Sequence, residues 1–296
     1  MSIAIIVNPI SGGARPDTAG RRVALAAAVV AAHGDAADVV VTERPGHARE
    51  LAAAAAARGA RLVIAWGGDG TVNEVASALA FGPTPMGIVA AGSGNGLARE
   101  LGVDRRPDRA IAAALHAVPR AIDAGELGGR FFVNLAGVGF DARVAERFGA
   151  CGSGRRGFLT YAVSAARELL VSRPFACRIA SGGRETPYRA LFVSLANSPQ
   201  FGNGARIAPQ ARVDDGLLDL VVFEEISRMA TIRAMPRLFL GGLERVRGLS
   251  TRQVARVVIE SDEPMAFHVD GEPVSGGVRL EGRVHPRALR VCVGRT

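Results

Sequence analysis

The chain contains no lysine, so all 36 of its basic residues are arginines. A Walker A phosphate-binding loop requires a lysine, and so does the third strand of a protein kinase, which excludes both kinds of ATP site. Schiff-base and pyridoxal chemistry are excluded as well, because both begin with a lysine amine. The net charge of +8 fits an anionic partner such as nucleic acid, a lipid surface or a nucleotide. Genome-wide compositional bias, visible in the alanine run at residues 52–57, explains the basicity equally well.

Cysteines, aromatic residues and long apolar runs are also scarce. Cys151, Cys177 and Cys292 are far apart and form no C-x-x-C pair, so the sequence predicts neither a zinc site nor a disulfide framework and favours a cytoplasmic protein. Aromatic content is 5%, the arginines are dispersed and no helix-turn-helix or RNP pattern occurs, so a nucleic-acid-binding protein is only a weak alternative. Because no apolar run reaches the length of a membrane span, we expect any membrane contact to be peripheral.

The first 120 or so of the 296 residues alternate between strand and helix signals. Strands are expected at residues 3–7, 38–42, 62–66 and 86–89, and helices at 21–32, 47–58, 71–80 and 108–117. The strands are apolar throughout, as strands covered on both faces are. This pattern predicts an α/β domain built on a doubly wound parallel sheet.

After residue 122 the pattern changes to short strands separated by Gly, Pro, Asn or Asp. These strands are expected at residues 130–135, 190–196, 217–223, 254–260, 266–269, 278–281 and 289–293, with helices at 158–172 and 227–241. We predict a nucleotide-binding domain at 1–122, rejoined by the segment 286–296, and a mostly antiparallel β-sandwich at 123–285. The substrate is expected in the cleft between them.

Three glycine-containing loops follow predicted strands, at residues 8–13, 67–71 and 92–96. Glycine lets the backbone approach an anion closely, and the first N–H groups of a following helix point at it, so such loops bind phosphate. Because they leave neighbouring strands, they predict one nucleotide site. A carboxylate in such a loop, that of Asp69, has to bridge to a metal or orient a hydroxyl, which indicates phosphoryl transfer.

Two other interpretations of these loops fail. The spacing at residues 67–70 is not the G-x-G-x-x-G of dinucleotide folds. Residues 92–94 do not form a nucleophile elbow, because Ala91 stands where that motif has its first glycine, so a serine hydrolase is poorly supported.

The loops and several later motifs resemble the diacylglycerol kinase catalytic family, which includes bacterial lipid kinases and the sphingosine and ceramide kinases and is distantly similar to NAD kinases. The likeness covers nearly the whole chain, at residues 8–9, 67–74, 92–95, 134–141, 208–219 and 270–272. It implies ATP-dependent phosphorylation of a lipid hydroxyl, diacylglycerol-like or sphingoid-like, with ATP and Mg²⁺ as cofactors. An NAD kinase-like enzyme, which shares Gly-Gly-Asp-Gly, is the alternative, although the motifs at 215–219 and 270–272 favour the lipid branch.

The resemblance also implies residue roles. ATP would be held by Asn8, Gly67, Gly68, Gly70, Thr71, Glu74, Gly92, Ser93, Gly94 and Asn95, with Asp69 near the transferred phosphate and its Mg²⁺. Asp270 would be the general base, with Glu272 beside it, because carboxylates two residues apart on an extended chain face the same way. The alternative is a hairpin turn, for which Asp-Gly is a common signal.

Further residues carry weaker expectations. Asp214, Asp215 and Asp219 are oxygen donors that suit Mg²⁺, and the family has a structural Mg²⁺ near this loop; a solvated turn is the alternative. Asp141 would contact the substrate headgroup or cap a helix. Gly96 stands where many bacterial members have an Asp that helps bind metal, which weakens the case for diacylglycerol itself. The five histidines lack metal-ligand spacing; His268, which we expect on the same strand face as Asp270, is the one worth following.

Residues 226–256 interleave seven arginines with apolar side chains. A basic face next to an apolar one is typical of segments that lie on anionic membranes, and a lipid acceptor has to come from a bilayer. The alternative is an amphipathic helix packed on the sandwich, with Pro236 interrupting its periodicity. A homodimer is a candidate for the oligomeric state of the protein.

Overall fold

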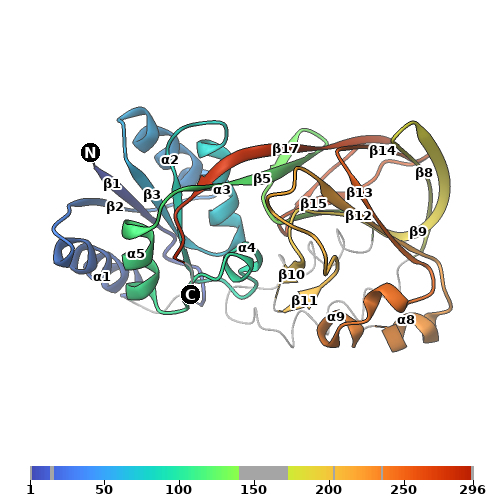
Figure 1. Cartoon of the computed structure of the whole chain (residues 1–296), viewed down its shortest axis with the longest axis horizontal. Helices are drawn as coiled ribbons and strands as arrows, with labels where there is room; N and C mark the ends of the chain where they lie inside the picture. Colours follow the sequence, from blue (N-terminus) through green and yellow to red (C-terminus); the bar gives the residue numbers. More distant parts are fainter. Residues whose placement is uncertain (1, 14–16, 140–172, 203, 235, 295–296) are drawn as a thin grey trace. The chain divides into compact units, whose positions relative to one another are not determined.

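The computed structural model describes residues 2–13, 17–139, 173–202, 204–234 and 236–294 (Figure 1). The chain divides into two compact units, residues 1–122 with 287–296, and residues 123–286. Two strands pass from one unit to the other, β5 (Arg120–Leu127) and β17 (Arg279–Val291). No helix in the described ranges is long and apolar enough to cross a membrane.

The first unit is built on a parallel sheet, as the sequence predicts. Its strands lie in the order β4-β3-β1-β2, and the last residues of β17 pair in parallel beyond β4. The bounds are β1 Ile3–Val7, β2 Ala37–Val41, β3 Leu62–Gly67 and β4 Met86–Ala90. All five residues of β1 are buried, which explains their unbroken apolar run.

Helices cover both faces of this sheet (Figure 1). They are α1 Thr18–Ala32, α2 His47–Ala57, α3 Asp69–Leu79, the short α4 Gly96–Glu100 and α5 Pro107–His116. Ile3 and Ile5 belong to one core cluster with side chains of α1 and α5, while α2 and α3 pack together and against β1 and β3. Because Cβ atoms alternate along a strand, this arrangement places one helix pair on each face.

The second unit is antiparallel and sandwich-like. Its strand order is β16-β15-β7-β9-β8-β14-β17, with β12 between β9 and β13. The bounds are β6 Arg130–Phe132, β7 Leu135–Gly139, β8 Phe175–Ser181, β9 Arg184–Ala196, β10 Gln200–Gly202, β11 Ala205–Arg206, β12 Leu218–Glu224, β13 Leu249–Val254, β14 Arg256–Glu260, β15 Phe267–Val269 and β16 Glu272–Val274. One face of β9 and β12 packs into a core with β7, β8, β14 and β15; the other lies under residues 205–211 and the helices that follow β12.

Several sequence-based boundaries are wrong in this unit. The strand expected at 130–135 is two strands, because the backbone N–H groups of Val133, Asn134 and Leu135 turn to a side chain instead of a neighbouring strand. The two last strands expected are one, β17, which tolerates Pro286 and a positive φ of 55° at Arg287. The helix expected at 227–241 is α8 Arg228–Ala234 and α9 Arg237–Leu240. The helix expected at 158–172 lies outside the described residues.

Candidate active site

Three loops of the first unit leave the same edge of the sheet. Strands β4, β3 and β1 are adjacent and parallel, so residues 91–95, 67–69 and 8–13 begin side by side. A Cβ added to Gly92 would lie 2.7 Å from the Cα of Gly68. A Cβ on Gly12, whose φ is +77°, would lie 2.4 Å from the carbonyl oxygen of Ala91. The loops therefore pack backbone against backbone, which only glycine permits at these positions.

Asp69 joins the second loop to the third. It is the first residue of α3, and its Oδ2 and Oδ1 accept the backbone N–H groups of Asn95 and Gly96, each at 2.8 Å. Burial raises the pKa of Asp69, and the two N–H donors oppose that shift. The sequence left only a metal or a hydroxyl as a partner for this carboxylate; the structure adds the amides of the neighbouring loop. Asp69 thus fixes where residues 95 and 96 lie.

The side chain of Asn95 closes its own loop. Its Oδ1 accepts the N–H of Gly92 at 2.9 Å, and its Nδ2 donates to the carbonyl of Gly92 at 2.7 Å. Asn95 itself has a φ of 52°, a left-handed conformation that asparagine tolerates better than most residues. Ser93 and Gly94 form the tip of this closed turn, and Nε of Arg99 donates to the Gly94 carbonyl at 2.9 Å. These hydrogen bonds hold the turn in one shape without a ligand.

The first loop is tied to the second through Asn8. Its Nδ2 donates to Oγ1 of Thr71 at 2.9 Å, while its Oδ1 accepts the N–H of Ile10 at 3.0 Å. Thr71 is buried, and a Cβ on Gly67 would come within 2.4 Å of its hydroxyl oxygen. The predicted residues Asn8, Gly67 and Thr71 therefore belong to one packed group, next to the loop that carries Gly68, Asp69 and Gly70.

Sequence reasoning missed Arg22, which holds the first loop against α1. Its Nη1 donates to the carbonyl of Asn8 at 2.6 Å and to Oγ of Ser11 at 3.0 Å, and its Nη2 donates to the carbonyl of Ser11 at 2.8 Å. The guanidinium carbon lies 5.8 Å from the ring centre of Trp66, within cation–π range. Burial lowers the pKa of Arg22. In a chain without lysine, Arg22 is the cation bonded to the first loop, as Arg99 is the one bonded to the third.

Glu74, predicted to bind ATP, is engaged elsewhere. Its Oε1 and Oε2 accept the backbone N–H groups of Gly46 and Ala48, at 2.8 and 3.0 Å, so it caps the start of α2. Five residues along a helix rotate a side chain by about 140° from the first, and this turns Glu74 away from Asp69. The structure gives Glu74 a structural role.

In the second unit, Asp270 occupies the turn between β15 and β16. Asp270 and Gly271 have φ values of 48° and 86°, the two positive angles of a tight hairpin turn. The buried carboxylate accepts three backbone N–H groups at 2.9 Å each: that of Val133 on Oδ2, and those of Asn134 and Leu135 on Oδ1. Asp270 is both a turn residue and the anchor of the segment between β6 and β7.

The expected pairing of Asp270 with Glu272 is wrong, because the turn breaks the extended chain between them. Glu272 begins β16 and is exposed, whereas Asp270 is buried. His268 is buried within β15, whereas Asp270 lies beyond the strand with a positive φ, so the expected shared strand face does not extend to Asp270; Nδ1 of His268 faces the N–H of Gly271 at 3.4 Å. Burial lowers the pKa of His268 to about 4, which keeps the ring neutral.

A buried hydrogen-bond chain, also missed from the sequence, leads away from Asp270. Nδ2 of Asn197 donates to the carbonyls of Val133 and Asp123, at 2.8 and 2.9 Å. Oδ2 of Asp123 accepts the N–H of Gly216 at 2.6 Å. Asn197 and Asp123 are almost fully buried, and the chain joins the segment held by Asp270 to the acidic turn at residues 214–219.

The three predicted magnesium ligands are not brought together. Asp214 pairs with Arg212 at 3.4 Å, while Asp215 accepts the N–H of Leu217 and the side-chain amide of Gln253, each at 3.0 Å. Burial and the charge of Asp215 raise the pKa of Asp219 to about 6. Across the described ranges, no three His, Cys, Asp or Glu side chains are arranged to hold a metal ion. Asp141 lies outside the described residues.

Comparison with known proteins accounts for both units. Residues 2–127 match the diacylglycerol kinase catalytic domain, and residues 134–293 match the YegS C-terminal NAD kinase beta sandwich-like domain. A Pseudomonas aeruginosa protein named "Probable lipid kinase YegS-like" is 34% identical, over 86% of this chain and 83% of that protein. A Mycobacterium tuberculosis protein named "Diacylglycerol kinase" is 31% identical, over 87% of this chain and 84% of that protein.

Solved structures agree on the fold. Two crystal structures of Bacillus anthracis proteins, the first described as "a putative diacylglycerol kinase" and the second as a diacylglycerol kinase, superpose with TM-scores of 0.82 and 0.75, at 23% and 21% identity. Each superposition covers 99% of this chain, and 95% and 97% of the respective relatives. With both domain types matched in order and relatives above 30% identity along most of its length, the chain belongs to the diacylglycerol kinase catalytic family, in the branch whose members carry the YegS-type C-terminal domain.

Proposed function

We propose that this protein is a lipid kinase that transfers the γ-phosphate of ATP to a lipid hydroxyl, diacylglycerol-like or sphingoid-like. The observation that carries the proposal is the joining of three glycine-containing loops, the second to the third through Asp69 and the first to the second through Asn8, in a chain whose two domains are those of this family. In the reaction the acceptor hydroxyl loses its proton, its oxygen bonds to the γ-phosphorus, and the bond from that phosphorus to the bridging oxygen breaks and releases ADP.

The nucleotide loops supply position and positive potential. Phosphoryl transfer depends mainly on alignment and charge neutralisation, and a loop that is already closed loses little entropy on binding. The N–H groups of Gly92, Asn95 and Gly96 are used inside the loops, so those of Ser93 and Gly94 at the tip of one turn, and those of Gly68 and Gly70, would face the phosphates. Arg22 fixes the first loop and adds a positive charge beside it, in a chain that has no lysine. Asp69 acts by placing the loop of Asn95.

Asp270 is our candidate for the group that receives the hydroxyl proton. Its three N–H donors favour the ionised carboxylate, which is the form a base must have, and they hold it in one orientation. The same donors weaken it as a base, so its contribution is the alignment of the hydroxyl as much as proton transfer. We do not assign Glu272 a part in the reaction, because it is exposed beyond the turn.

Mg²⁺ fits the acidic turn only in part. Burial and, after it, the charge of Asp215 raise the pKa of Asp219, and a divalent cation would relieve the repulsion between the two carboxylates. Asp215 and Asp219 would hold such an ion, which would neutralise their charge and stiffen the turn. Asp214 is drawn toward Arg212 and is not needed for this site. A second Mg²⁺ would accompany ATP, as nucleotide phosphates usually require.

The molecule that accepts the phosphate distinguishes a lipid kinase from the alternative, an NAD kinase-like enzyme. The C-terminal domain is described as NAD kinase beta sandwich-like, so NAD is the competing acceptor. We propose further that the enzyme works in the cytoplasm as a peripheral membrane protein, with a homodimer as the candidate assembly. ADP release measured with diacylglycerol, a sphingoid base or NAD as the only acceptor tests the activity. We expect turnover with a lipid, and turnover with NAD alone would replace the proposal.

A further inference from the structure

The longest helical excursion described in the second unit lies between β12 and β13. These strands pair directly, yet residues 225–248 leave the sheet between them and carry α8, α9 and the 3₁₀ turn η2 Leu243–Arg245 (Figure 1, orange). We call residues 226–248 the α8–α9 arm. Ala234, Leu243 and Val246 of the arm are buried in the core cluster beneath it, which fixes the arm to the sheet.

Three apolar side chains of the arm are exposed to solvent. Leu240 is 85% exposed, Met229 is 57% exposed and Phe239 is 39% exposed. They belong to the same segment as Ala234, Leu243 and Val246, which are buried against the sheet, so the arm has an inner apolar face and further apolar side chains in solvent. A single exposed hydrophobic residue such as Leu240 is ordinary on a protein surface. Three on one short segment indicate a surface that binds a partner or a membrane.

The arm is also strongly basic. Its 23 residues include five arginines and one acidic residue, Glu244. Arg237 is exposed, and the side chain of Arg245 is 83% exposed with only a loose contact to Glu244, at 3.8 Å. Charges this exposed contribute little to folding stability, which leaves them available to a partner. Apolar and basic side chains exposed together match a surface with negative charge outside and hydrocarbon beneath.

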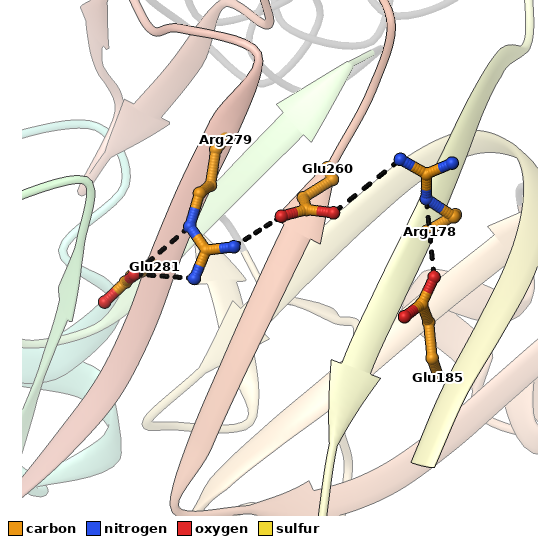
Figure 2. Close-up of polar contacts among 5 residues, drawn as sticks. All are labelled: Arg178, Glu185, Glu260, Arg279 and Glu281. Atoms are coloured by element: carbon orange, nitrogen blue, oxygen red, sulfur yellow. Dashed lines mark hydrogen bonds and ion pairs between the residues drawn. The ribbon is translucent and has the colours of Figure 1, made fainter. Parts of the chain in front are cut away.

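On the sheet of the same unit, by contrast with the arm, arginines are paired with carboxylates. Across β17, β14, β8 and β9, five charged side chains form an alternating series, Glu281, Arg279, Glu260, Arg178 and Glu185 (Figure 2). Arg279 lies between Glu281 and Glu260, and Arg178 contacts Glu260 and Glu185 at 3.8 and 3.4 Å. Each arginine of this series is neutralised by the protein itself, with carboxylates in excess. The series would therefore attract an anionic surface less than the arm does.

We propose that the α8–α9 arm docks on the surface of an anionic lipid bilayer, with Leu240, Phe239 and Met229 entering the interface and Arg237 and Arg245 facing lipid headgroups. The inference rests on the proposed lipid-kinase function only for the choice of partner, because a lipid acceptor resides in a bilayer. Docking by the arm would hold the enzyme where its acceptor is concentrated.

Vesicle co-sedimentation of the full-length chain tests the docking. Wild-type protein should bind vesicles of phosphatidylcholine with phosphatidylglycerol more tightly than vesicles of phosphatidylcholine alone, and salt should weaken this binding. We expect Leu240→Gln to weaken it, and Arg237→Glu with Arg245→Glu to weaken it by about tenfold or more. Val118→Gln is the apolar control, since Val118 is 86% exposed in the first unit, and Arg184→Glu in the β8–β9 hairpin is the charge control.

Three outcomes separate the possibilities. Arm variants that bind anionic vesicles like wild type, or controls that lose binding equally, would overturn the docking. Unchanged vesicle binding with an altered oligomeric state in gel filtration would make the arm a contact between copies, which also overturns it. Kinase activity measured on a short-chain acceptor dispersed without vesicles should be the same in arm variants and wild type. If wild type itself phosphorylates no lipid yet binds vesicles through the arm, the proposed function fails and the docking stands.

Discussion

Replacing Asp270 by asparagine should damage both folding stability and catalysis, because the carboxylate has two tasks. Asparagine keeps one acceptor oxygen, which can still receive the N–H groups of Asn134 and Leu135. Its NH₂ group would then face the N–H of Val133, which now points at Oδ2 from 2.9 Å. A buried donor left without an acceptor costs about 1–3 kcal/mol, and the two remaining bonds lose their charge assistance.

This loss should be visible in the melting temperature. For a unit of this size each kcal/mol lowers Tm by about 2–4 °C, so Asp270→Asn should melt roughly 3–10 °C below wild type. Asp262→Asn is the matched control, because Asp262 is an exposed aspartate of the same unit, and it should melt like wild type.

The catalytic loss is measured well below the melting transition, with ATP and lipid saturating. Loss of a positioned base typically lowers kcat by about 10² to 10⁴, and the KM for ATP should change little because the nucleotide loops belong to the first unit. Wild-type stability together with more than half of wild-type kcat would refute both parts of the reasoning. A lower Tm with normal kcat would leave Asp270 as an anchor only.

Three further predictions follow from the contacts. Asp69→Ala should lower kcat/KM for ATP by about 10² or more, and far more than Ser93→Ala, because it frees the two N–H groups that place the third loop; equal and mild losses would contradict this. Arg22→Met should raise the KM for ATP about tenfold, with only partial rescue by Arg22→Lys, because lysine lacks the planar fork that contacts Asn8 and Ser11; full rescue would show that charge alone matters. The pKa of Asp219 is about 6 in the folded protein and about 4 in the unfolded chain. Its contribution to the free energy of unfolding is therefore fully present below about pH 4 and is lost as the pH rises through 6, a change of about 3 kcal/mol. Without Mg²⁺, Asp219→Asn should therefore melt above wild type at pH 7.5 and like wild type at pH 4, and Mg²⁺ should raise the Tm of wild type alone; parallel melting curves at both pH values would contradict it.

The sequence predicted those parts of the molecule that local pattern determines. Apolar runs and glycine positions located the first unit's sheet and its three loops, since strand burial and close backbone approach leave direct marks on composition. Pro236 indicated the break between α8 and α9. The Asp270-Gly271 turn was among the alternatives, because this dipeptide favours two positive φ angles.

Contacts between distant segments could not be predicted in this way. Nothing local distinguishes Arg22 from Arg21, yet a rotation of about 100° per residue turns one toward the first loop and leaves the other exposed beside Asp17. The capping contact of Glu74 was missed for the same reason, because its place in a motif did not show that its carboxylate would accept the first N–H groups of α2.

Asn197 shows the same limit inside the second unit. Its two hydrogen bonds reach residues more than 60 positions away in sequence, so a single chain gives no sign of them. The anchoring of residues 133–135 by Asp270 spans an even larger separation, of 135 to 137 positions. These contacts are long-range packing, which periodicity and propensity do not encode.

The most direct test of the central claim follows the γ-phosphate itself. Purified protein is incubated with γ-labelled ATP, Mg²⁺ and a mixture of diacylglycerol, a sphingoid base and NAD, and the products are partitioned between chloroform and water. A lipid kinase places the label in a chloroform-extractable phospholipid, and Asp69→Ala abolishes this product. Label recovered only in the aqueous phase as phosphorylated NAD would contradict the account.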